Sequence, residues 1–126
     1  MEKGSIMSEP ITVRVFEIVG NGFCVASDDG QKVHDQIAIA LREGQKVNLS
    51  FLNVDSLTSA FLNAAIGQLY GEFSGEQIKA GLSVKDMSND DLALLKRVVD
   101  TAKQYFKDPE RFKKAREEVL EDEDDS

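Results

Sequence analysis

The amino-acid sequence predicts an α/β fold, with a small mixed β-sheet of about four strands, helices beside it and further helices toward the C-terminus. Three observations support this prediction. Apolar residues alternate at a period of two around residues 11–16 and 46–52, as in strands with one buried face. After each of these stretches, apolar residues recur at helical spacing. The resulting order, in which a strand follows a helix and leads into another helix, is typical of α/β sheets.

The first two predicted strands form an antiparallel hairpin. Ile11, Val13 and Val15 alternate with their neighbours, and a second apolar piece, Phe23-Cys24-Val25-Ala26, follows Gly20-Asn21-Gly22. Glycine and asparagine tolerate the positive φ angles that a tight connection between strands needs. In such a strand, we expect Cys24 to be a small buried apolar residue and not a reactive thiol.

A helix over about residues 30–43 comes next. Asp28 or Asp29 is the expected N-cap, and Gly44 is expected to end the helix. His34 on this helix has Asp35 beside it, but no second histidine and no serine positioned by the sequence. We therefore expect an exposed or rim histidine, without a catalytic role.

The stretch from Val47 to Gly71 changes period partway along. A strand over about 46–52 is followed by a polar turn, Asp55 to Ser59, and then by a helix from about Ser59 to Tyr70 with Gly71 as C-cap. A helix N-terminus presents free backbone amides and favours negative charge. Two interpretations of its hydroxyl groups stay open: Ser56 or Thr58 caps the helix, or Ser59 accepts a phosphoryl group from a kinase.

The C-terminal part is predicted to be mainly helical. Ser74 to Gln77 has the form of a capping box before a short helix through residues 78–80, and Leu82–Val84 is a candidate edge strand. Residues 88–91 are expected to cap a longer helix, and Asp108-Pro109 to start another. We expect a flexible N-terminus over 1–10, one domain over 11–120 and a disordered acidic tail over 121–126.

Composition narrows the possible functions. The 126 residues carry a net charge of −8, which argues against nonspecific nucleic-acid binding. One cysteine and one histidine leave no zinc-type ligand set, and no phosphate-cradling loop, dinucleotide fingerprint or nucleophile elbow is present. We expect neither an enzyme nor a cofactor. Without a long apolar run or the apolar centre of a signal peptide, the chain is expected to be cytoplasmic and to bind no membrane.

The stretch Leu49-Ser50-Phe51-Leu52-Asn53-Val54-Asp55-Ser56-Leu57-Thr58-Ser59-Ala60-Phe61-Leu62-Asn63 resembles STAS-type domains, the fold of bacterial anti-anti-sigma factors. More closely, it is similar to a bacterial family of STAS-like domains of unknown function, and the likeness runs from about Phe16 to Phe112. In anti-anti-sigma factors, an ATP-binding serine kinase phosphorylates the first serine of an Asp-Ser-Ser-Gly turn. The corresponding residue here is Ser59, with Thr58 in place of the aspartate and Ala60-Phe61 in place of Ser-Gly.

The resemblance implies a non-catalytic regulatory module that binds a protein partner, such as an ATP-binding serine kinase-like protein, with Ser59 as phosphoacceptor. The alternative is a sensor of a small anionic ligand or nucleotide that uses the same helix N-terminus. In either case, the expected contact surface consists of the exposed polar residues of the turn and of the following helix: Asp55, Ser56, Thr58, Ser59, Asn63 and Gln68. The identity of the partner, the pathway, the oligomeric state and the role of the acidic tail stay open.

Overall fold

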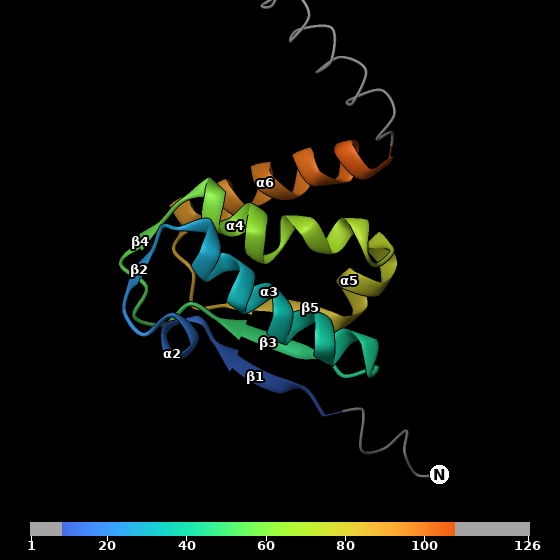
Figure 1. The fold of residues 1–126 in the computed structure, drawn as a ribbon, viewed down its shortest axis with the longest axis horizontal. Coiled ribbons are helices and arrows are strands. Elements are labelled where there is room, and N and C mark those ends of the chain that lie inside the picture. Colours follow the sequence, from blue (N-terminus) through green and yellow to red (C-terminus); the bar gives the residue numbers. More distant parts are fainter. Residues whose placement is uncertain (1–8, 108–126) are drawn as a thin grey trace, which may run out of the picture.

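The computed structural model describes residues 9–107 and has the predicted α/β class (Figure 1). Its elements follow one another in this order: β1 (Ile11–Arg14), α2 (Val15–Val19), β2 (Phe23–Cys24), α3 (Ser27–Arg42), β3 (Val47–Ser50), β4 (Ser56–Leu57), α4 (Ser59–Ala65), the 3-10 helix η1 (Gly67–Gly71), α5 (Gly75–Gly81), β5 (Leu82–Lys85) and α6 (Asn89–Lys107). Predictions for residues 1–8 and for those after Lys107, including the last helix and the acidic tail, lie outside the described residues.

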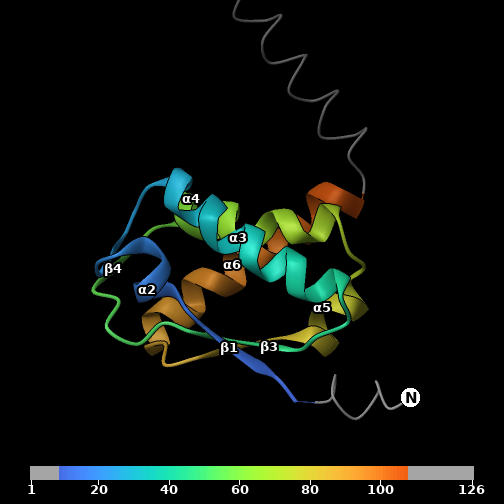
Figure 2. The same ribbon diagram turned by 60° about the horizontal axis from the view of Figure 1, so that its bottom comes forward.

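A three-stranded parallel sheet, in the order β1-β3-β5, supports the fold. Val13, Leu49 and Val84 stand beside one another across its strands and pack into the core. Thr12 and Ser83, on the alternate positions of the edge strands, are exposed. The period of two in the sequence therefore corresponds to one apolar and one polar face of the sheet. Helices α3, α4 and α6 all lie on one side of this sheet (Figures 1 and 2).

The predicted hairpin is wrong. Every strand pairing in the described part of the chain is parallel, and β2 pairs with β4 in a separate two-stranded ladder. The chain leaves β1 through helix α2, in which Val15 is fully buried and Ile18 and Val19 are half-buried. That spacing of three and four residues is helical. Gly20, with φ 94°, ends α2 and does not serve a hairpin turn.

Helix α3 begins earlier than predicted. Its N-cap is Ala26, which makes no side-chain capping hydrogen bond, and Asp28 and Asp29 lie within the first helical turn. The two aspartates are therefore not N-caps, but their carboxylates lie near the positive end of the helix dipole and stabilise the start of α3. Gly44, with φ 78°, stands just after the end of the helix, as predicted.

The helix predicted over residues 59–70 is divided in two. Helix α4 ends at Ala65, and after Ile66 the chain tightens into η1, which ends at Gly71. Both parts contribute fully buried side chains to the core, among them Phe61, Leu62 and Leu69. Burial of these side chains holds the segment in place although its hydrogen-bond pattern changes.

The predictions for residues 74–107 are confirmed. Ser74 and Gln77 form a complete capping box at the start of α5, and β5 is an edge strand of the sheet. The Ser88 hydroxyl accepts a hydrogen bond from the Asp91 amide (3.1 Å), in the first turn of α6. Leu95, Val98 and Ala102 form the buried side of α6, while Leu92 and Phe106 are partly exposed.

Candidate functional site

The predicted turn lies where β4 leads into α4. Ser56 and Leu57 form β4, opposite Phe23 and Cys24 of β2. The backbone amides of Asp55 and Ser56 both donate to the Gly22 carbonyl, at 2.8 and 3.1 Å. The turn is therefore attached to the loop before β2 through its backbone, and the Asp55 carboxylate also lies beside Gly22. Asp55 is exposed and Ser56 is half-buried.

Thr58 is the N-cap of α4, as one of the two sequence interpretations predicts. Its hydroxyl oxygen accepts a hydrogen bond from the Phe61 amide (3.2 Å) and donates one to the Val25 carbonyl (2.7 Å). The threonine thus caps the helix, and it also joins the helix start to the residue after β2. A cap of this kind contributes about 1 kcal/mol.

Ser59 is the first residue of α4, and its side chain is exposed. Asn63, one turn further along, is also exposed. Both line an open hollow between α4 and α6 with a volume of about 560 Å³, together with Ala60 on α4 and Leu94, Arg97, Val98 and Thr101 on α6. We call this feature the α4–α6 hollow. It brings a candidate phosphoacceptor and a cationic side chain to the same small surface.

Arg97 is the one charged residue among the described residues that line this hollow. In the sequence it belongs to a C-terminal stretch in which basic and acidic residues alternate, a pattern typical of a solvated helix face, so the sequence gives no reason to select it. Within the described residues, no carboxylate forms an ion pair with it. Leu94, Arg97 and Thr101 are spaced by three and four residues and so share one side of α6. From that spacing, the sequence could have predicted that Arg97 shares a helix side with Leu94 and Thr101.

Gln68, the last of the predicted contact residues along the chain, lies on a different helix from Ser59 and Asn63. It is exposed, but it lies on η1, beyond the point where α4 ends, and it does not line the hollow. A continuous helix over 59–70 was the basis for grouping it with Asn63. The break at Ile66 removes that basis.

His34 is buried, with 5% of its surface exposed, so the prediction of an exposed or rim histidine is wrong. Its Nε2 donates to a Glu72 carboxylate oxygen (2.8 Å), and its Nδ1 lies 3.1 Å from both the Gln31 amide nitrogen and an Asp35 carboxylate oxygen. Arg42 donates to the other Glu72 oxygen (3.2 Å). These hydrogen bonds link the C-cap residue of η1 to α3. They also give both ring nitrogens of His34 polar partners, which is why the side chain can be buried.

Cys24 is fully buried, as predicted. Burial, followed by the nearby negative charge of Asp29, raises the pKa of its thiol to about 11. The thiol therefore stays protonated at neutral pH and is a poor nucleophile. Within residues 9–107, no group of three or more histidine, cysteine, aspartate or glutamate side chains is placed to hold a metal ion.

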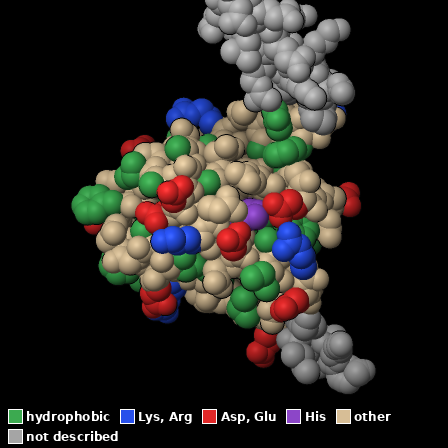
Figure 3. Space-filling model, viewed as in Figure 1, with side chains coloured by type: hydrophobic (Ala, Val, Ile, Leu, Met, Phe, Trp, Pro, Cys, Tyr) green, Lys and Arg blue, Asp and Glu red, His purple; other side chains and the backbone are tan. Residues whose placement is uncertain are grey.

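The face that carries α3 and α4 shows acidic and basic side chains interspersed among polar and apolar ones, with no large region of a single sign (Figure 3). In the described part of the chain, no helix combines the length and apolar character needed to cross a bilayer.

Comparison with known proteins gives one match. A family model described as a STAS-like domain of unknown function matches residues 29–92, about half of the chain. The matched region runs from the first turn of α3 into the first turn of α6 and includes the turn at Thr58-Ser59. Neither the curated proteins nor the solved structures contain a match.

Proposed function

Since the chain belongs to this family of STAS-like domains of unknown function, we propose that it is a regulatory module without catalytic activity that binds a protein partner at the start of α4. STAS-like domains are generally non-catalytic. The proposed contact surface consists of Asp55, Ser56, Ser59 and the α4–α6 hollow.

The observation that carries the proposal is the combination of a fixed backbone with exposed polar side chains. Hydrogen bonds from the turn to Gly22 and Val25 hold the backbone of residues 55–58, while Ser59 and Asn63 are exposed. A preorganised surface loses little conformational freedom on binding, which favours recognition by a partner.

We propose Ser59 as the phosphoacceptor of this module and an ATP-binding serine kinase-like protein as its partner. A phosphoryl group would add a charge of about −2 at the start of α4. Arg97, on the facing side of the same hollow, is free of ion pairs with described residues and offers a cation to that charge. Phosphorylation would then add negative charge to a hollow whose lining mixes polar and apolar side chains, and a partner that fits one form would be repelled by the other.

The test combines phosphorylation with partner capture. Wild-type chain, Ser59→Ala and Ser59→Glu are tagged, incubated with native host lysate and ATP, and recovered for mass spectrometry. We expect phosphate on Ser59 of the wild type, none on Ser59→Ala, and capture of a kinase-like protein by the wild type but not by Ser59→Glu. Ser27→Ala is the matched control, because Ser27 is likewise an exposed serine at the first position of a helix.

Two outcomes would contradict parts of this proposal. Phosphate incorporation that persists in Ser59→Ala would exclude Ser59 as the acceptor, and equal capture by wild type and Ser59→Glu would remove the switch while keeping the interaction module. If no partner is captured and a nucleotide instead raises the melting temperature of the wild type but not of Ser59→Glu, the same surface acts as a ligand sensor.

A further inference from the structure

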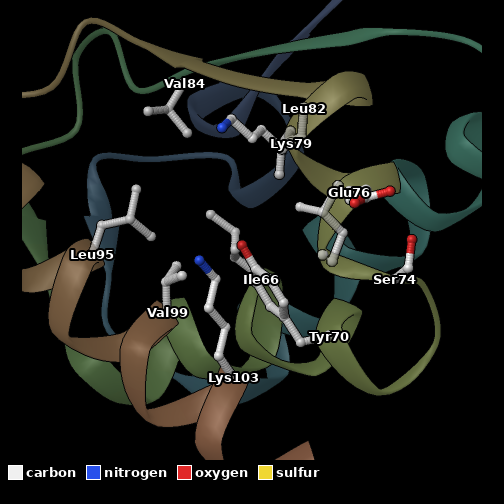
Figure 4. A pocket seen from close by; sticks show the side chains of 12 residues that line it. Ile66, Tyr70, Ser74, Glu76, Lys79, Leu82, Val84, Leu95, Val99 and Lys103 are labelled. Carbon is white, nitrogen blue, oxygen red and sulfur yellow. The ribbon is translucent and has the colours of Figure 1, made fainter. Parts of the chain in front are cut away.

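A second concave surface lies away from Ser59, between α6, α5 and β5. We call it the α5–α6 trough. Six aliphatic side chains line it, from α5, β5, α6 and the residue between α4 and η1: Ile66, Ile78, Leu82, Val84, Leu95 and Val99. Figure 4 shows five of them, all except Ile78, as labelled sticks. Its volume of about 690 Å³ falls within the range of small-molecule sites, ~300–1,000 Å³. Such a set of aliphatic walls favours an apolar ligand body over a fully polar one.

Two lysines border these apolar walls. Lys79 comes from α5 and Lys103 from α6, and neither forms an ion pair with a carboxylate of the described residues. In Figure 4, the amino end of Lys103 points toward the middle of the trough, and that of Lys79 extends toward Val84. The Glu76 carboxylate, the one acidic group in the lining, points away from both. With two lysines and one glutamate, the charged side chains of the described lining carry a net charge of +1.

Tyr70 adds a hydrogen-bond donor beside Lys103. Its ring lies under the Lys103 ammonium, 5.9 Å from it, and its hydroxyl points into the trough (Figure 4). Burial, and then the charge of Asp100, raise the pKa of the Tyr70 phenol. The phenol thus keeps its proton at neutral pH and can donate it to an anionic oxygen.

We propose that the α5–α6 trough binds a small amphipathic carboxylate, a molecule with an aliphatic chain or ring and a single carboxylate. Its carboxylate lies between Lys79 and Lys103 and accepts a hydrogen bond from the Tyr70 hydroxyl, while its apolar body covers the aliphatic walls. This site shares no residue with the α4–α6 hollow, so its test does not depend on whether Ser59 is phosphorylated.

Decanoate is the probe for this site. We expect it to raise the melting temperature of the full chain saturably, and to shift the backbone amide signals of residues 78–84 and 95–103 in a two-dimensional NMR spectrum. The Lys79→Gln/Lys103→Gln variant should bind decanoate more weakly by a factor on the order of ten or more, since charge-assisted hydrogen bonds are lost. Decanol, which lacks the charge, and decylamine, which reverses it, should bind far more weakly than decanoate.

Lys85→Gln is the matched control. Lys85 is an exposed lysine of β5, which also lines the trough, but Lys85 itself is outside the lining and forms no ion pair with a carboxylate of the described residues. Its loss should leave decanoate affinity unchanged. Equal binding of decanoate and decanol, equal affinity in the double lysine variant, or amide shifts confined to other regions would each overturn the proposal. An acidic amphipathic peptide that shifts these amides where decanoate does not would assign the trough to a protein partner and overturn it too.

Discussion

Gly30→Ala tests the packing that positions α4 under the candidate site. Gly30 is in the first turn of α3, and a Cβ added to it would meet the backbone carbonyl oxygen of Phe61 and lie 2.9 Å from the Ala64 Cβ. A backbone oxygen cannot rotate away as a flexible side chain can. The two helices would have to separate, although both contribute fully buried residues to one core.

Two opposing contributions set the size of the effect. Alanine is favoured over glycine in a helix by about 1 kcal/mol, whereas overpacking a buried contact costs about 1–3 kcal/mol. Because the contact here is with backbone, we expect a cost at the upper end and a net loss of about 1–2 kcal/mol. For a chain of this size that lowers the melting temperature by roughly 3–10 °C.

Thermal unfolding followed by circular dichroism, with urea denaturation in parallel, measures this loss. Gly75→Ala is the control, because Gly75 is also in the first turn of a helix, α5, and an added Cβ there meets nothing within 4 Å. Without a clash, it should keep the stability of the wild type or gain up to about 1 kcal/mol from its higher helix propensity. A Gly30→Ala protein as stable as the wild type or more so would refute the close approach of α3 to α4.

Three further predictions follow from single side chains. Thr58→Ala should lose about 1 kcal/mol of unfolding free energy, and Thr58→Ser should retain most of it, because the hydroxyl caps α4; equal losses in urea denaturation would exclude the cap as the cause. Hydrogen bonds from His34 and then Gln31 lower the pKa of Asp35 from its usual 3.8. Its carboxylate therefore stabilises the folded state above that value, and the contribution disappears as the pH falls through the lowered pKa. Asp35→Asn should be less stable than the wild type at pH 7 and lose this difference in acid, and a difference that persists at the lowest pH would contradict it. Cys24 should resist alkylation by iodoacetamide at pH 8 in the folded protein and react once the protein is unfolded in urea, which mass spectrometry can follow; equally fast alkylation of the folded chain would show that the thiol is accessible.

The sequence by itself determined the features that depend on neighbours in the chain. The alternation around Leu49 and Val84 predicted strands with one core face, because side chains of a strand alternate between faces wherever the strand is placed. The capping box of Ser74 and Gln77 and the cap at Thr58 were predictable for a similar reason, since each bond closes within three residues. The STAS-like resemblance was also carried by a short continuous stretch, and the family match confirms it.

Only the tertiary structure decided which distant segments meet. Val15 is fully buried at the start of α2 instead of extending β1. Strand β1 pairs with β3 and not with β2, which gives the parallel order β1-β3-β5. His34 can be buried because the carboxylate of Glu72, 38 residues away, accepts a hydrogen bond from its Nε2–H group. Arg97 faces the hollow of Ser59 because α6 packs beside α4. Contacts over such separations depend on how helices pack on the sheet, and the spacing of residues along the chain does not contain that information.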